Sequence, residues 1–195
     1  MSSSALTGRP ARREVLLAAA DAVVQRDGAS ASMASIAAEG GITKPVLYRH
    51  FTDKSGLYAA LAERYTDRLL AQLTRALAAG GSPRERVERT VGAYLSAIED
   101  EPQVYRFLVL SVEAAPAQGQ IRSFLRRLSE QLAAGIAREL GWPETDVRAA
   151  AWAAGIVGMV QSAGDWWLES RACSRAELTT SLTELLWGAY AAAVD

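Results

Sequence analysis

The side chains best able to do chemistry gather in one short stretch of the chain, at Lys44, Tyr48, Arg49, His50 and Lys54. They include both lysines of the sequence and its one histidine, while every other cation is an arginine. Ammonium, guanidinium and imidazole N–H groups and a phenol hydroxyl all donate hydrogen bonds to phosphate oxygens. The stretch indicates a phosphate-bearing partner, and the alternative is a solvated basic face on a surface helix.

The same chain offers little that could perform catalysis. One histidine and one cysteine, Cys173, cannot form a zinc-binding cluster. Neither GxxxxGK[ST] nor GxGxxG occurs, and Gly40-Gly41 precedes a helix without following a strand. The nearby carboxylates Glu99 and Glu101 fall at helix ends and are interpreted as solvated. We therefore expect no enzymatic activity, no bound metal and no cofactor.

The segment around the cations has the pattern of two short helices joined by a sharp turn. Ser32 can cap the first helix, and Gly40-Gly41 can adopt the positive φ that the turn needs. Thr43 can cap the second helix through its hydroxyl, and Pro45 falls in that helix's first turn, where its missing N–H costs little. This spacing predicts a helix-turn-helix.

The second of these helices has two chemically different faces. Leu47 and Phe51 are four residues apart and share the side expected to be buried. Lys44, Val46, Tyr48, Arg49 and His50 remain for the outer side. An outer face of cations, a hydroxyl and a β-branched methyl is what a helix-turn-helix needs to enter the major groove of DNA.

The run GITKPVLYRHFTDKSGLYAAL closely resembles the DNA-binding signature of the TetR family of bacterial regulators. The matching positions are Thr43, Lys44, Leu47, Tyr48, His50, Phe51 and Lys54. The resemblance covers about the first third of the chain, and beyond it only the arrangement of helices is similar.

The resemblance implies a role for each outer residue. Thr43, Pro45 and Val46 would face base edges, and the methyl groups of Thr43 and Val46 suit thymine. Tyr48, His50 and Lys54 match phosphate-contacting positions, and Lys44 is a further one. Arg49 can bind a guanine or a phosphate. The full predicted DNA-binding set is Ser32, Thr43, Lys44, Pro45, Val46, Tyr48, Arg49, His50 and Lys54.

Size and composition fit one cytoplasmic protein with a substantial core. The chain has 195 residues, half of them hydrophobic, and no run approaches eighteen consecutive apolar residues, so we expect no membrane partner. A single cysteine favours a reducing compartment. The net charge of −1 argues against broad affinity for nucleic acid, but residues 1–55 carry +2 and the remainder −3.

Helical periodicity with clear breaks predicts an all-α fold of about nine helices. Residues 1–10 form a predicted flexible arm, and Arg9, Arg12 and Arg13, at its end and just beyond it, either reach a phosphate or the minor groove or only solubilise the chain. Residues 11–55 form the predicted DNA-binding domain, which extends into the next helix to about residue 71, and residues 56–195 form a ligand-binding and dimerisation domain. Serine–glutamate pairs at Ser82 and Ser174 mark two helix starts.

The last two predicted helices are apolar on more than one face, and an excess apolar face is usually covered by a partner. In the family, these two helices pair with their copies in a dimer, and a two-fold dimer presents two helices to a palindromic operator in double-stranded DNA. The interface prediction comprises Val160, Ala163, Trp167, Leu182, Leu185, Leu186 and Ala189.

An effector pocket is also expected in the middle helices, because the family is built that way. Aromatic and soft apolar residues with a few polar groups suit a small apolar or amphipathic effector. The predicted lining is Tyr94, Tyr105, Phe107, Phe124, Trp152, Met159, Gln161 and Trp166. For each residue, ordinary core or interface packing is the competing interpretation.

The sequence thus predicts a ligand-responsive repressor that binds a palindromic operator as a homodimer. The alternatives are a small-molecule sensor that acts as an activator or has little DNA-binding role, and a helical interaction protein.

Overall fold

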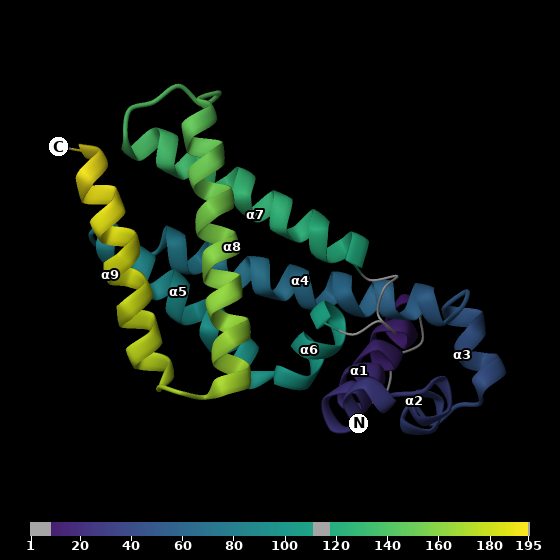
Figure 1. The fold of residues 1–195 in the computed structure, drawn as a ribbon. Helices are drawn as coiled ribbons and strands as arrows, with labels where there is room; N and C mark the ends of the chain where they lie inside the picture. Colours follow the sequence, from purple (N-terminus) through teal and green to yellow (C-terminus); the bar gives the residue numbers. More distant parts are fainter. Residues whose placement is uncertain (1–8, 111–117, 195) are drawn as a thin grey trace, which may run out of the picture. The chain divides into compact units, whose positions relative to one another are not determined.

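The computed structural model describes residues 9–110 and 118–194, and within them every regular element is a helix (Figure 1). A short 3₁₀ helix, η1 (Gly28–Ser30), follows the first of nine α-helices. These are α1 (Arg9–Asp27), α2 (Met33–Glu39), α3 (Lys44–His50), α4 (Lys54–Ala78), α5 (Pro83–Asp100), α6 (Pro102–Leu110), α7 (Gln118–Glu139), α8 (Val147–Ser170) and α9 (Arg175–Val194). The predicted all-α fold with about nine helices is confirmed.

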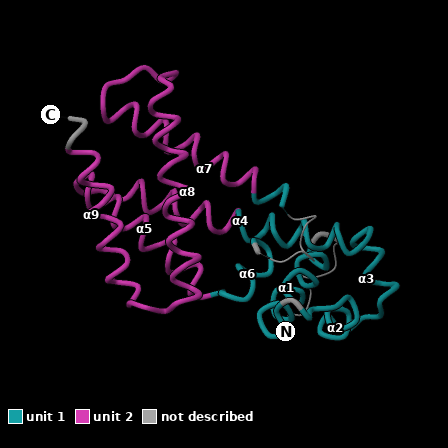
Figure 2. The backbone as a smooth tube through the Cα atoms, in the orientation of Figure 1, with its two compact units in different colours: residues 1–66, 101–121 teal, residues 67–100, 122–195 magenta. Residues whose placement is uncertain are grey.

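The helices divide into two compact units that are not consecutive along the chain (Figure 2). Unit 1 takes in the chain up to Thr66 together with Glu101–Ile121, and unit 2 takes in Asp67–Asp100 and the chain from Arg122 onward. The helix α4 has residues in both units. The sequence did not indicate that Glu101–Ile121 packs with the N-terminal helices. The functional boundaries at residue 55 and near residue 71 stay predictions.

The core of unit 1 is formed by the apolar faces of its helices, with α1 packed against α2 and α6. Each leucine or isoleucine removed from water contributes about 1.5–3 kcal/mol to this core. The fully buried side chains include Leu16, Val23, Val24, Ile36, Leu47, Leu57, Leu61 and Leu108.

Tyr58 of α4 connects three parts of unit 1. Its buried ring meets the ring of Phe107 from α6 edge to face, with 4.8 Å between centroids. Its hydroxyl donates a hydrogen bond to the carbonyl of Ala31, just after η1, over 3.3 Å. Because aromatic pairs of this kind add about 0.5–1.5 kcal/mol to burial, Tyr58 fixes α6 and the entry to α2 against α4.

In unit 2, α5 packs along α9 and crosses α8. The crossing with α8 is close at Gly164, where an added Cβ would lie 2.9 Å from Ile98 Cδ1 and 3.0 Å from Tyr94 Cε1. At Gly92, the nearest atom of α9 is Thr179 Cγ2 at 3.6 Å, an ordinary contact. Gly164 is therefore required for close helix packing, whereas Gly92 is not.

Side-chain caps fix the helix starts of unit 2. The backbone N–H of Ser82 donates to Glu85 at 2.7 Å, and the N–H of Ser174 donates to Glu177 at 2.8 Å. Both predicted capping boxes are confirmed. Arg89 donates to the carbonyls of Ala79 and Gly80 at 2.7 Å each, which satisfies acceptors at the end of α4.

Two helix starts differ from the prediction. The first turn of α1 already contains Arg9 and Pro10, while the rest of the predicted arm lies outside the described residues. The helix α8 starts at Val147, where the Asp146 carboxylate accepts the N–H of Arg148 at 2.9 Å and so acts as the cap. Thr43 precedes α3, but its hydroxyl makes no capping hydrogen bond.

Residues 9–110 and 118–194 contain neither a metal-binding cluster nor a membrane span. Among these residues no group of three His, Cys, Asp or Glu side chains could hold a metal ion. No helix there is long and apolar enough to cross a membrane.

Candidate nucleic-acid interface

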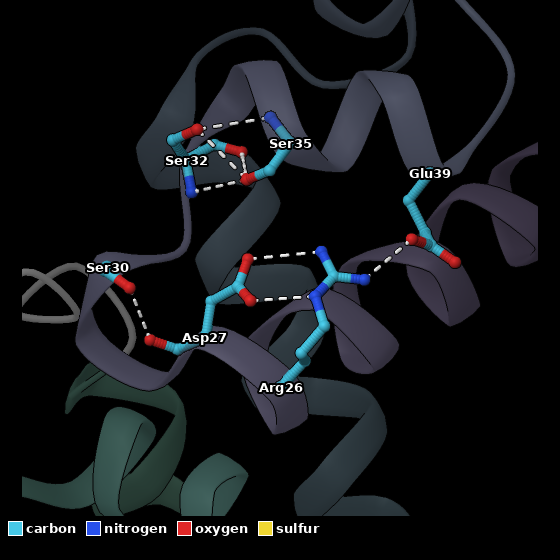
Figure 3. A network of polar contacts seen from close by, with 6 residues as sticks. All are labelled: Arg26, Asp27, Ser30, Ser32, Ser35 and Glu39. Carbon is cyan, nitrogen blue, oxygen red and sulfur yellow. Dashed lines mark hydrogen bonds and ion pairs between the residues drawn. The ribbon is translucent and has the colours of Figure 1, made fainter.

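The helix α2 starts at a reciprocal cap formed by two serines (Figure 3). The Ser35 N–H donates to the Ser32 hydroxyl at 3.1 Å, and the Ser32 N–H donates to the Ser35 hydroxyl at 3.0 Å. The predicted cap at Ser32 is confirmed. Ser35, which takes the place usually held by Glu or Gln in a capping box, was missed because its shorter side chain departs from that pattern.

The turn between α2 and α3 needs each of its two glycines for a different reason. Gly41 has a φ of +63°, and its N–H donates to Ala38 while that of Ile42 donates to Ala37, the paired bonds of a Schellman motif. Gly40 has an ordinary φ of −76°, but an added Cβ would lie 2.8 Å from Leu16 of α1. The turn is thus fixed by conformation at one glycine and by packing at the other.

The helix α3 has the two faces that the sequence predicts. Leu47 is fully buried and Phe51, which follows the helix, is 3% exposed. On the other side Lys44, Pro45, Arg49 and Tyr48 are exposed, the last by 44%. The outer face of α3 therefore carries cations and a phenol hydroxyl into solvent while two apolar side chains hold the helix on its unit.

Two of the predicted residues are less open than the pattern implies. Val46 and His50 are half-buried, and His50 Nδ1 is enclosed without a hydrogen-bond partner among the described residues. The ring nitrogen that remains for an outside partner is Nε2. Thr43 is exposed, and because its hydroxyl does not cap α3, that hydroxyl remains for contacts outside the chain.

Lys54 begins α4 next to its cap. The carboxylate of Asp53 accepts the N–H of Gly56 at 2.7 Å and so caps the start of α4. Lys54 Nζ lies 5.2 Å from the centroid of the Tyr58 ring, within the range of a cation–π interaction. The lysine is therefore held near the joint between α3 and α4.

An arginine ties the end of α1 to the end of α2 (Figure 3). Arg26 donates to Asp27 at 2.8 Å and to Glu39 at 3.0 Å. These hydrogen bonds, chiefly the one to Asp27, raise the pKa of Arg26 above its ordinary value. The ion pairs are exposed and so contribute little energy, but they orient α2. No sequence signal relates Arg26 to Glu39, thirteen residues later.

The predicted dimer residues divide into exposed and buried ones. Trp167 is 1% exposed, its Nε1 donates to the Cys173 carbonyl at 2.8 Å, and Arg171 lies 4.8 Å from its ring centroid. Leu182 is also buried. Their own unit encloses these two side chains, and the interface set stays a prediction. The others are half-buried or exposed: Val160, Ala163, Leu185, Leu186 and Ala189.

The residues predicted to line a pocket fall in both units. Tyr105 and Phe107 are buried in unit 1, and Phe124 is buried in unit 2. Trp166 is 51% exposed. The remaining four are half-buried in unit 2: Tyr94, Trp152, Met159 and Gln161. Their part in effector binding stays a prediction.

Comparison with known families covers nearly the whole chain. A model described as "Bacterial regulatory proteins, tetR family" matches residues 16–61. A second, "Tetracyclin repressor-like, C-terminal domain", matches residues 72–195. The first match contains α2, α3 and the start of α4, and so includes the helix-turn-helix described above.

Individual relatives agree with these matches. An uncharacterized HTH-type transcriptional regulator of Mycobacterium tuberculosis is 32% identical over 186 residues, covering 94% of this chain and 79% of the relative. The HTH-type transcriptional activator FasR of Mycolicibacterium smegmatis is 28% identical over 180 residues, covering 91% and 81%.

Among solved structures, a tetR-family transcriptional regulator from Streptomyces coelicolor has the same fold. Its TM-score is 0.77 at 23% identity, with 96% of this chain and 83% of that chain covered. The helix-turn-helix, the two family models and the 32% identical relative together place the protein: it is a helix-turn-helix transcriptional regulator and belongs to the TetR family.

Proposed function

We propose that the protein is a ligand-responsive repressor that binds a palindromic operator as a homodimer. The observation that carries this proposal is the division of α3, which buries Leu47 and exposes Lys44, Tyr48 and Arg49. An exposed helix face with these donors matches the chemistry of the major groove and its flanking phosphates.

Within that face, position along α3 suggests two kinds of contact. Thr43, Pro45 and Val46 come first and would meet base edges, as the first residues of a recognition helix do. The uncapped hydroxyl of Thr43 supports this, because it can hydrogen-bond a base. Arg49 would bind either a guanine or a phosphate.

The phosphate contacts would come from residues that surround this base-reading segment. They comprise the hydroxyls of Tyr48 and Ser32, the Nε2 atom of His50, and the cations Lys44 and Lys54. Such contacts give affinity and salt dependence, whereas the base-edge contacts give sequence preference.

The homodimer is supported by exposed apolar residues on α8 and α9. Trp166 is 51% exposed and Leu185 is 59% exposed. Gly155, Gly158 and Gly188 lie in the same two helices, and an added Cβ at each would meet nothing within 4 Å. A helical glycine costs about 0.5–1 kcal/mol relative to alanine, so close approach of a second copy would explain residues that their own chain does not require.

The response to an effector would pass along α4, which has residues in both units. An effector that binds one arrangement of the dimer more tightly shifts the population away from the DNA-binding one. A small apolar or amphipathic molecule suits the aromatic side chains of unit 2. Structures with and without effector that show the same separation between the two α3 helices would contradict this mechanism.

The sign of regulation has a specific alternative. The relative FasR is named an activator, so activation by this chain is the second candidate. A reporter gene placed behind the bound operator separates the two: a repressor lowers expression and an activator raises it. A sensor with little DNA-binding role would leave the expression of the reporter unchanged.

The first experiment selects bound duplexes from a random-sequence pool and measures their affinity by fluorescence anisotropy across a salt series. We expect one palindromic sequence, two protomers per site, and binding that weakens steeply with salt. Tyr48→Phe should weaken binding while preserving the ring, and Tyr190→Phe in α9 is the matched control. Equal, weak binding to every duplex would overturn the proposal.

A second experiment tests the dimer. Leu185→Arg places a charge on the exposed face of α9 and should yield monomers in sedimentation together with loss of tight operator binding. Gln131→Arg on the exposed side of α7 adds the same charge elsewhere and should change neither. Dimers that survive Leu185→Arg would remove this residue from the interface.

A further inference from the structure

The cations of unit 1 differ in how they are neutralised. Arg26 is paired with Asp27 and Glu39, and Arg64 lies 3.5 Å from Glu14. A second set has no carboxylate within ion-pair distance among the described residues: Arg12, Arg13, Lys44 and Lys54. Two of this second set are the lysines of the helix-turn-helix region, and the other two lie on α1, outside it.

Arg13 is held against the helix-turn-helix by an aromatic ring. Its guanidinium carbon lies 5.0 Å from the centroid of the Phe51 ring, and the side chain is half-buried. Phe51 ends α3, with its N–H donating to Leu47 at 3.0 Å. Arg13 therefore occupies a fixed place beside the last turn of α3, although it lies 38 residues before Phe51 in the sequence.

Lys54, at the start of α4, is held in the same manner, with its Nζ 5.2 Å from the centroid of the Tyr58 ring. A ring face orients a cation without neutralising it, whereas a carboxylate both orients and neutralises. The rings of Phe51 and Tyr58, seven residues apart in the sequence, thus each orient one full positive charge. An oriented, unneutralised cation is ready to bind an anion from outside the chain.

We propose that Arg13 of α1 binds a DNA phosphate, so that the DNA-binding surface includes the first helix as well as the helix-turn-helix. The guanidinium donates two parallel N–H bonds to the phosphate oxygens, a geometry that Arg provides and Lys does not. This phosphate would be a neighbour of the phosphates that His50 and Lys54 contact. This inference rests on the proposed DNA-binding function and extends the contacts of that same surface.

A purely structural role makes a different prediction. If Arg13 only covers Phe51, its loss lowers the stability of unit 1 and leaves the salt dependence of DNA binding unchanged. If it binds a phosphate, its loss removes one released counterion per protomer. The slope of log affinity against log salt concentration then becomes shallower by about 0.9 per protomer, or by about 2 for a duplex that binds two protomers.

The experiment measures anisotropy of the selected duplex, and of a scrambled duplex of the same composition, between about 50 and 200 mM salt. Arg13→Gln and Arg13→Leu should both reduce the salt slope by about 2 and weaken binding equally on the two duplexes. Leucine keeps Phe51 covered, so this variant reports on the charge even if glutamine disturbs folding. Arg13→Lys should keep the slope and lose some affinity.

The control is Arg75→Gln, which removes the same charge from an exposed site on α4. Arg75 lies about 30 Å along the helix from Lys54, several screening lengths away, and its loss should leave the slope unchanged. An unchanged slope in both neutral Arg13 variants overturns the inference and leaves the proposed function intact. A wild-type protein that prefers no duplex overturns both.

Discussion

The glycines and exposed apolar residues of the two units have different explanations. In unit 1, Gly40 is needed because Leu16 approaches it, and Gly28 and Gly41 are needed because their φ is positive. In α8 and α9 of unit 2, Gly155, Gly158 and Gly188 meet no such demand within the chain. The same helices expose Trp166 and Leu185, while α3 exposes mainly polar groups.

This difference separates the glycines around the helix-turn-helix, which the fold of unit 1 requires, from three glycines of α8 and α9, which their own chain does not require. The outer face of α3 presents hydrogen-bonding groups to water, and a hydrated partner such as DNA can bind to them reversibly. The surface of α8 and α9 presents apolar side chains and three helical glycines, whose added Cβ atoms would meet nothing within 4 Å among the described residues. If the proposed homodimer forms, this surface is the one that it would cover.

The largest expected change in stability comes from a leucine-to-alanine substitution in unit 1, compared with the same substitution in unit 2. Leu47→Ala removes a fully buried side chain and should lower the free energy of unfolding by about 2–5 kcal/mol. Leu185→Ala, at an exposed site, should cost less than about 0.5 kcal/mol in dilute protein. Urea titrations at two protein concentrations check this, because a dimer adds a cost at Leu185 only at the higher one. Equal losses in dilute protein would contradict the comparison.

A second pair of substitutions compares two helix crossings inside unit 2. Gly164→Ala brings a methyl within 3 Å of Ile98 and Tyr94 and should cost about 1–3 kcal/mol by overpacking. Gly92→Ala makes only an ordinary contact with Thr179 and should be neutral, or stabilising by up to about 1 kcal/mol. Thermal unfolding of the two variants measures the difference. A Gly164→Ala protein as stable as wild type would show that α8 can move away from α5 at little cost.

A smaller effect is expected at a glycine that faces outward. Gly158→Ala should stabilise the isolated monomer by about 0.5–1 kcal/mol through helix propensity. If a second copy packs closely on this face, the same methyl weakens dimerisation. Sedimentation and urea titration on one sample measure both quantities. Stabilisation with unaltered dimerisation would place Gly158 outside the contact.

The smallest expected effect concerns acid. Bonds from the hydroxyl and backbone N–H of Ser174 hold the pKa of Glu177 below its usual value. Because the pKa is lower in the folded state, ionised Glu177 contributes its full stabilisation above about pH 4.3. This stabilisation is lost as the pH falls through the folded-state pKa. Glu177→Gln should therefore flatten the acid side of the stability profile. Glu184→Gln, at an exposed site on the same helix, is the comparison, and identical profiles for both would contradict the assignment.

The sequence predicts most helix starts because caps are local. The pairs at Ser82 and Ser174 and the carboxylate of Asp53 act over three residues, so their effect does not depend on the rest of the fold. The capping prediction at Thr43 was wrong for a local reason as well, since a residue can precede a helix without its side chain turning back to it.

Long-range packing was less predictable. A helical stripe shows which side of α6 is buried but not that Phe107 is buried against Tyr58, 49 positions earlier. The neighbouring residues Trp166 and Trp167 have the same chemistry, yet one is 51% exposed and the other 1%. Because α8 is apolar around much of its circumference, periodicity could not identify the face that its own chain covers. The outer face of α3 was predictable because Leu47 and Phe51, four residues apart, mark one buried side and leave the cations on the other.

The place of α6 has a consequence for how such proteins can be recombined. A crossover after α4 would join a new C-terminal half to helices that had lost the ring of Phe107, leaving Tyr58 facing a foreign side chain. A working chimaera would have to carry residues 101–121 along with the first 66. Exchange of the C-terminal half between relatives is therefore constrained by α6, a nine-residue helix that lies after the crossover point in the sequence but packs in unit 1.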